Sequence, residues 1–166
     1  MIQYDCIKLK GWEKAGKLKT FISELKSQVD GREVLLAGGA FDPYKPTDEI
    51  VIRLNYHFRN QKKTDINILN ILRIANPYYP WGILSGVMAL RCLTETESTE
   101  ITVAGFDFYL THRVRGVKPG EPKVQVGGHP IGENVEVFLD LISDKRVAMS
   151  PNTFSALEIY REHFGL

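Results

Sequence analysis

The apolar residues of this chain recur at two spacings, one typical of helices and one typical of buried strands. Between residues 11 and 30, large apolar side chains return every three or four positions, which places them on one face of a helix, and Gly31 favours the end of that helix. Short apolar runs that close on glycine or polar residues instead predict buried strands. Such strands are expected within residues 33–41, 48–58, 65–74 and 100–108.

The second half of the chain continues the alternation of helix and strand. Residues 81–94 offer a wide apolar helical face, and a further amphipathic helix follows His129, with Glu133 in its first turn. Between these helices, residues 116–128 are rich in Gly, Pro, Lys and Val with little periodicity, and we expect them to form a loop.

The C-terminal residues complete this pattern. Residues 146–150 predict a short strand, and the last helix is expected to begin with Ser150 as its N-cap and Pro151 at its first position. Strands that alternate with helices predict an α/β fold, a single-domain Rossmann-like α/β/α sandwich with a mostly parallel sheet.

Composition narrows the class of protein. The 166 residues, 43% hydrophobic and 25% charged, are typical of one soluble globular domain that needs no metal or disulfide to support its core. A net charge of +1 gives no overall field that would attract nucleic acid or a membrane surface. The two cysteines, Cys6 and Cys92, lack metal-site spacing, and no apolar run reaches the roughly 18 residues of a membrane span. We therefore expect a cytoplasmic protein with reduced thiols, no membrane span and no nucleic-acid partner.

Candidate ligand-binding residues follow the predicted strands, because ligands of parallel sheets bind beyond the carboxyl ends of the strands. Gly38 and Gly39 in "AGGAF" allow the backbone to approach a phosphate or ribose closely, although a plain tight turn explains them equally well. Asn55 ends the next strand, where its amide could donate to a phosphate or simply terminate the strand.

A serine and a glycine interrupt the apolar pattern of residues 81–94. Glycine inside a helix costs about 1 kcal/mol relative to alanine, so the presence of glycine at position 86 requires an explanation. Either the backbone packs closely at Gly86, or the helix begins near Ser85 with its N-terminus facing a ligand.

Two histidines, His112 and His129, lie just after predicted strand or loop segments. Imidazole can donate a hydrogen bond to a phosphate or transfer a proton near neutral pH. A histidine in either position is more often a surface or capping group than a catalyst. The patterns alone therefore indicate a small α/β domain with a nucleotide or phosphate site.

Taken in order, four segments resemble the motifs of the eukaryotic-type sialyltransferases. The long motif of that family, a strand, a G-N turn and then D/E-x-V-x-R-x-N, resembles "EVLLAGGAFDPYKPTDEIVIRLN". The short motif, with the V-x-x-G-F that follows it, resembles "ILSGVMALRCLTETESTEITVAGFDF". The third motif, a histidine beside aromatics, is similar to "FYLTHR", and the last, a histidine and a glutamate before an apolar helix, is similar to "HPIGENVEVFLDLISDKRVAMS".

The chain departs from the family pattern at several positions. Gly38 stands where the family has the asparagine of its G-N turn. Cys92 matches one cysteine of the family disulfide, but Glu33 stands at the position of the other, so that bridge cannot form. Glu133 lies one residue earlier than the family pattern places its glutamate, and the chain is far shorter than a family catalytic domain.

The resemblance implies a site for cytidine monophosphate (CMP) in a glycosyltransferase A-type variant of the fold, with residues 1–166 forming one sialyltransferase-like nucleotide-sugar-binding domain. His112 would bind the phosphate, and His129 would be the general base of an inverting transfer. The resemblance implies no metal and no cofactor, with a CMP-sugar as donor substrate and a small molecule or glycan as acceptor; a homo-oligomer is compatible with it. The residues implied to bind the nucleotide are Gly38, Gly39, Asn55, Ser85 and Gly86.

Two alternatives stay open at this point. A hydrolase of CMP-sugars or cytidine nucleotides could use the same scaffold, with water in place of the acceptor. A short chain favours the hydrolase, because it has few residues to enclose an acceptor site. A nucleotide-binding module without catalysis is the alternative from another class, and Gly38 in place of the expected donor is the best argument for it.

Overall fold

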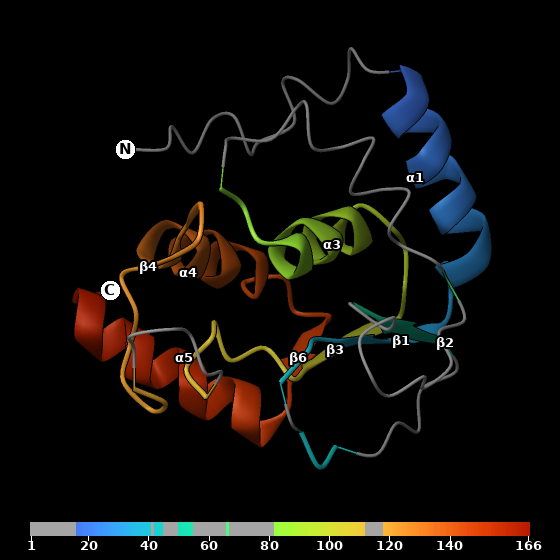
Figure 1. Cartoon of the computed structure of the whole chain (residues 1–166). Coiled ribbons are helices and arrows are strands. Elements are labelled where there is room, and N and C mark those ends of the chain that lie inside the picture. The colour runs from blue at the N-terminus through green and yellow to red at the C-terminus, as the bar shows by residue number, and fades with distance from the viewer. Residues whose placement is uncertain (1–15, 41, 45–49, 55–65, 67–81, 112–117) are drawn as a thin grey trace.

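A computed structural model of the chain shows a parallel sheet flanked by helices (Figure 1). It describes residues 16–40, 42–44, 50–54, 66, 82–111 and 118–166, with only the backbone of residues 16–19 and 21. The elements follow one another in the order α1 (Gly16–Val29), β1 (Glu33–Ala37), β2 (Ile50–Arg53), α3 (Ser85–Thr94), β3 (Glu100–Ala104), β4 (Gln125–Val126), β5 (His129–Pro130), α4 (Ile131–Leu141), β6 (Val147–Met149) and α5 (Pro151–Phe164).

The main sheet has the strand order β2-β1-β3-β6, and all neighbouring strands are parallel. β1 lies between β2 and β3, with Leu35 opposite both Val51 and Thr102. The chain passes from β1 to β2 on one side and then returns to β3 on the other, so the strand order reverses between β1 and β3. The predicted α/β class and parallel sheet are confirmed, and the reversal marks the place where such sheets usually bind ligands.

The strands direct alternate side chains to two faces of the sheet. On one face, Val34 and Leu36 are fully buried in a large apolar core to which α1, α3, α4 and α5 all contribute. Each such side chain stabilises the fold by about 1.5–3 kcal/mol relative to exposure. On the other face a smaller cluster forms, and none of the described helices contributes to it; its members are Leu35, Ala37, Ala104, Tyr44 and Val51.

Several predicted elements are confirmed. α1 ends at Val29, just before Gly31, which has a left-handed φ of 72°. The strands expected near residues 33, 50, 100 and 147 are β1, β2, β3 and β6. α5 begins as predicted, with the Ser150 hydroxyl accepting the N–H of Thr153 at 3.2 Å and Pro151 in first position.

Two predictions need correction. The helix expected from residue 81 begins only at Ser85, because Gly82 has φ 100° and Leu84 is extended. The loop expected to run to residue 128 ends in a hairpin, in which Gln125–Val126 pairs antiparallel with His129–Pro130. The two intervening glycines supply the turn, with Gly127 at φ 57°, and strands of two residues are too short to show periodicity in a sequence.

Other predictions lie outside the described residues. Of the strand expected within 65–74, the structure describes only Ile66, which is buried. Asn55, His112 and Cys6 also fall outside the described ranges.

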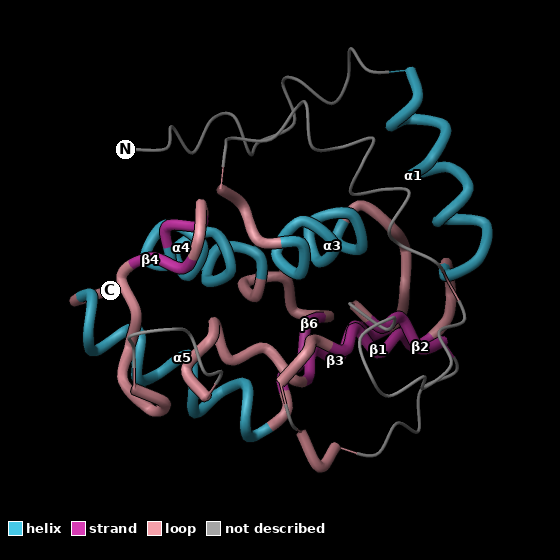
Figure 2. Tube along the Cα trace, viewed as in Figure 1, coloured by secondary structure: helices cyan, strands magenta, loops and turns pink. Residues whose placement is uncertain are grey.

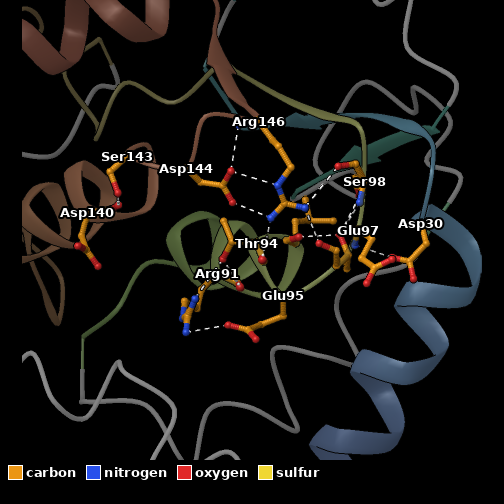
Figure 3. A network of polar contacts seen from close by, with 12 residues as sticks. Asp30, Arg91, Thr94, Glu95, Glu97, Ser98, Asp140, Ser143, Asp144 and Arg146 are labelled. Carbon is orange, nitrogen blue, oxygen red and sulfur yellow. Dashed lines mark hydrogen bonds and ion pairs between the residues drawn. The ribbon is translucent and has the colours of Figure 1, made fainter.

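A charged network joins the elements at the amino ends of β3 and β6 (Figure 3). The Arg146 guanidinium donates to the carbonyl oxygens of Thr94 at 3.0 Å, Ser98 at 3.3 Å and Thr96. It also pairs with the Asp144 carboxylate at 2.6 Å. Because carbonyls at the end of a helix lack partners within it, Arg146 caps α3 and fixes the turn into β3.

No helix within the described ranges is long and apolar enough to cross a membrane.

Candidate functional site

The carboxyl ends of β1 and β3 meet through glycine backbone. The Gly38 N–H donates to the Ala104 carbonyl at 2.7 Å, and the Ala40 N–H donates to the Gly105 carbonyl at 3.1 Å. A Cβ on Gly38 would lie 2.3 Å from the Gly105 oxygen, a distance that no side chain tolerates. Gly38 is therefore required for contact between two strand ends, while its neighbour Gly39 is exposed.

Asp42 bridges this strand reversal to the start of α5. Its Oδ2 accepts the N–H of Gly105 at 2.9 Å and the hydroxyl of Ser150, and its Oδ1 accepts the N–H of Tyr44 at 2.9 Å. Ser150 in turn caps α5 through Thr153. The chain's own carboxylate thus occupies these three donors. We did not identify Asp42 from the sequence, because its partners lie 63 and 108 residues away.

The structure confirms the expected helix start near Ser85 and the expected close packing of the backbone at Gly86. The helix begins at Ser85, and the extended residue before it gives no side-chain cap to its first turn. A Cβ on Gly86 would lie 2.3 Å from Cε1 of Phe106, so glycine is needed for that ring to pack on the helix. Asn134 accepts the N–H of Leu84, but no side chain in the described ranges caps the N–H groups of the first turn itself, and a helix N-terminus of this kind is suited to an anion.

His129 lies in β5, held by its pairing with Val126. Its Nδ1 is 2.9 Å from the carbonyl oxygen of Gly82. A carbonyl oxygen can only accept, so Nδ1 has the hydrogen and a neutral ring presents a lone pair on Nε2. The side chain is half-buried, and Nε2 makes no hydrogen bond to any residue in the described part of the chain.

Asn134, in the first turns of α4, is a site residue that our sequence analysis missed. It is 0% exposed, and its side chain accepts the N–H of Leu84 and donates to the carbonyls of Gly82 and Pro130. A signal was present, since Asn134 falls among the buried positions of α4, between Ile131 and Phe138. A polar residue at such a position needs buried partners.

Four predicted site residues that the structure describes, Gly38, Ser85, Gly86 and His129, are half-buried and are linked by a series of contacts. Gly38 contacts Gly105, the following Phe106 contacts Gly86, and α3 connects back through Ser85 to Gly82, which His129 contacts. α3 and α4 lie side by side above the sheet in Figure 2, so the hairpin before α4 reaches the start of α3. The structure therefore brings Gly38, Ser85, Gly86 and His129 to the same end of the molecule.

A strained segment follows β3. Phe108 and Tyr109 have φ values of 49° and 64°, a left-handed conformation that costs about 1–3 kcal/mol for each such residue. The Tyr160 hydroxyl donates to the Phe108 carbonyl at 2.7 Å, and Asp107 accepts the N–H groups of Tyr109 and Thr111. Burial raises the pKa of the Tyr109 phenol, and the Asp107 carboxylate raises it further, so this hydroxyl stays protonated at neutral pH.

The buried side chain of Lys123 binds backbone carbonyls of this strained segment. It is 3% exposed, and its ammonium donates to the carbonyl oxygens of Tyr109, of Leu110 at 3.2 Å and of Glu121 at 3.3 Å. Three carbonyls replace water around the charge, which is why the ammonium can be buried with no carboxylate partner in the part of the chain that the structure describes.

The remaining candidate groups are structural or lie apart from these four residues. Cys92 is a free, fully buried thiol, and burial raises its pKa to about 12, so it is unreactive at neutral pH. Within the described ranges no three His, Cys, Asp or Glu side chains are grouped so that they could hold a metal ion. A surface hollow at the end of α5, lined in part by Glu158, Arg161 and Leu166, contains none of the predicted site residues.

Comparisons of the chain with models of known families, with curated proteins and with solved structures give no match.

Proposed function

We propose that the chain is a metal-independent, inverting glycosyltransferase that uses a CMP-activated sugar, with His129 as its general base. The proposal combines the resemblance of the four sequence motifs to the sialyltransferases with the geometry of His129. It also assigns the parallel sheet to a Rossmann-like, glycosyltransferase A-type fold and the protein to the cytoplasm, and the free Cys92 in place of a disulfide supports that location.

The observation that supports this function best is the orientation of the His129 ring. A general base needs a fixed imidazole whose free nitrogen can take a proton, and the contact of Nδ1 with Gly82 provides both. A histidine with only a surface role does not require a backbone partner that fixes one ring nitrogen in this way.

The nucleotide side of the site is proposed at the start of α3. None of the described side chains caps the first turn of α3, and Ser85 is half-buried there, so a phosphate could accept hydrogen bonds from its N–H and hydroxyl groups. Asp42 already occupies the Gly105 N–H and the Ser150 hydroxyl, which favours the α3 side over the Gly38 turn. Asn55 and His112 stay predictions as further donors to the phosphate.

The reaction would then proceed by direct displacement. The acceptor oxygen bonds to the anomeric carbon while the bond from that carbon to the phosphate oxygen breaks, and its electron pair leaves with CMP. The acceptor proton passes to Nε2 of His129. Attack from the side opposite the phosphate inverts the configuration, and a positioned base of this kind contributes about 10²–10⁴-fold to the rate.

The test is calorimetric titration with CMP, UMP and GMP, followed by measurement of CMP released from CMP-sialic acid. Selective binding of CMP, with release that requires an added hydroxyl acceptor, would support the transferase. Release without any acceptor would identify the hydrolase, and selective binding without release under any condition would identify a binding module. Equal or absent binding of the three nucleotides would refute the CMP site.

A further inference from the structure

We propose that Asn134 is a positioning residue for His129, because its side chain fixes the carbonyl group that orients the imidazole. The inference rests on the proposed function, in which Nε2 of His129 must be free to accept a proton. It goes beyond that function by naming the residue that determines which ring nitrogen has the hydrogen.

The Asn134 amide is fully used and fully buried. Its Oδ1 accepts the N–H of Leu84 at 2.7 Å, and its Nδ2 donates to the carbonyls of Gly82 at 3.0 Å and Pro130 at 2.6 Å. Because one atom faces a donor and the other faces two acceptors, the orientation of the amide is unambiguous. Asn134 thereby connects the segment before α3 to the start of α4.

The Gly82 carbonyl is the shared partner of the two side chains. It accepts from Nδ1 of His129 at 2.9 Å and from Nδ2 of Asn134 at 3.0 Å, which uses both of its lone pairs. Gly82 has φ 100°, and a Cβ there would lie 2.6 Å from the Gly128 oxygen. Without Asn134, His129 would be the one described side chain left to hold this carbonyl in place, on a glycine whose backbone rotates easily.

The position of the Gly82 carbonyl decides the tautomer of His129. A neutral histidine in water prefers its hydrogen on Nε2, a form in which Nε2 cannot accept a proton. The hydrogen bond made by one ring nitrogen determines the state of the other, so an oxygen fixed opposite Nδ1 selects the form with a free Nε2. Asn134 acts on the base through Gly82 and makes no contact with the substrate.

A purely structural role for Asn134 would satisfy the same three backbone groups, and stability alone does not separate the two roles. Only the positioning role predicts a change at the His129 ring when Asn134 is altered. The test therefore measures the ring directly.

The first measurement is ¹⁵N nuclear magnetic resonance of the histidine rings, with the His129 signals assigned by their loss in His129→Gln. In the wild-type protein we expect the hydrogen on Nδ1 of neutral His129. Asn134→Asp keeps the oxygen that accepts from Leu84 but loses both donors, and we expect it to shift the hydrogen toward Nε2. Asn152→Asp, an exposed change on α5, is the matched control and should leave the ring unchanged.

The second measurement is the kinetics of CMP release from the CMP-sugar. We expect Asn134→Asp to lower kcat by about a hundredfold, the effect of a misplaced catalytic group, with little change in KM for the donor. A changed KM with kcat intact, or an unchanged tautomer and kcat, would overturn the inference.

The wild-type spectrum keeps the inference testable even if the variants do not fold, because a hydrogen on Nε2 of His129 would contradict it by itself. Absence of CMP release by the wild-type protein, with Nδ1 still protonated, would instead refute the proposed function. The two failures are therefore distinguishable.

Discussion

The two ends of the sheet are closed by different kinds of contact. At the amino ends of β3 and β6, Arg146 directs its guanidinium to three carbonyls and to Asp144, so its donors all serve the protein (Figure 3). At the carboxyl ends, glycine backbone packs against glycine backbone, Phe108 and Tyr109 are left-handed, and Nε2 of His129 makes no bond to a described residue. Chemistry is therefore expected at the carboxyl ends, where groups remain available to a ligand.

The largest effect that would test this comparison is the loss of His129. We expect His129→Ala to lower the rate of CMP release by about 10²–10⁴-fold, because the proton of the acceptor loses its base. CMP affinity, measured by titration, should change little. His163→Ala is the matched control, since His163 is exposed near the end of α5. Wild-type turnover in His129→Ala would show that the reaction does not take place at this end of the sheet.

Arg146→Ala should affect the amino end alone. Loss of the charged hydrogen bonds to α3 and to the turn before β3 should lower the free energy of unfolding by about 1.5–3 kcal/mol. Chemical denaturation measures this, and CMP binding below the transition should be unchanged. Arg161→Ala is the control, because Arg161 pairs with Glu158 at a distance of 2.9 Å on an exposed surface, where such pairs contribute little. Weaker CMP binding in Arg146→Ala would show that the two ends are coupled.

Two glycines near helix starts should respond oppositely to a methyl group. Gly86→Ala forces a Cβ against the Phe106 ring, and the overpacking should exceed the helix propensity gained, giving a net loss of about 1 kcal/mol. In Gly132→Ala the new Cβ meets Phe164 at 3.4 Å, a near-ordinary contact, so we expect stability equal to or up to about 1 kcal/mol above wild type. Thermal unfolding of both variants checks the sign, and a stabilising Gly86→Ala would contradict the close packing of α3 on Phe106.

The smallest expected effect concerns acid stability at the amino end. The hydrogen bond from Arg146 lowers the pKa of the Asp144 carboxyl. A carboxyl with a lowered pKa stabilises the fold above its unfolded pKa, about 4, and this contribution is lost as the pH falls through the lower folded value. Asp144→Asn should therefore be less stable than wild type at pH 7, with a difference that shrinks below about pH 4. A difference that stays constant with pH would exclude this ionisation as the cause.

Elements with strong local signals could be predicted from the sequence. Ser150 and Pro151 mark the start of α5, Gly31 follows α1, and the apolar runs of β1 and β3 are buried as expected. These features depend on neighbouring residues, so a single sequence contains the information.

The rest depends on contacts between distant residues. Asn134 reaches Gly82 across 52 positions and Asp42 reaches Ser150 across 108, and neither partner can be identified from local pattern. The late start of α3 comes from the backbone at Gly82, with φ 100°, and at the extended Leu84, which the apolar pattern of residues 81–94 does not reveal. For His129 the sequence indicated a candidate base, but only its contact with Gly82 shows which nitrogen is free.

The buried ammonium of Lys123 has one further consequence. Carbonyl oxygens gathered around a positive charge are the arrangement in which proteins also hold metal cations, but here the cation is covalently attached to the chain. It cannot be removed by a chelator, exchanged for another ion or diluted away. The left-handed turn at Phe108 and Tyr109 should therefore keep its shape whatever the salt composition of the surroundings.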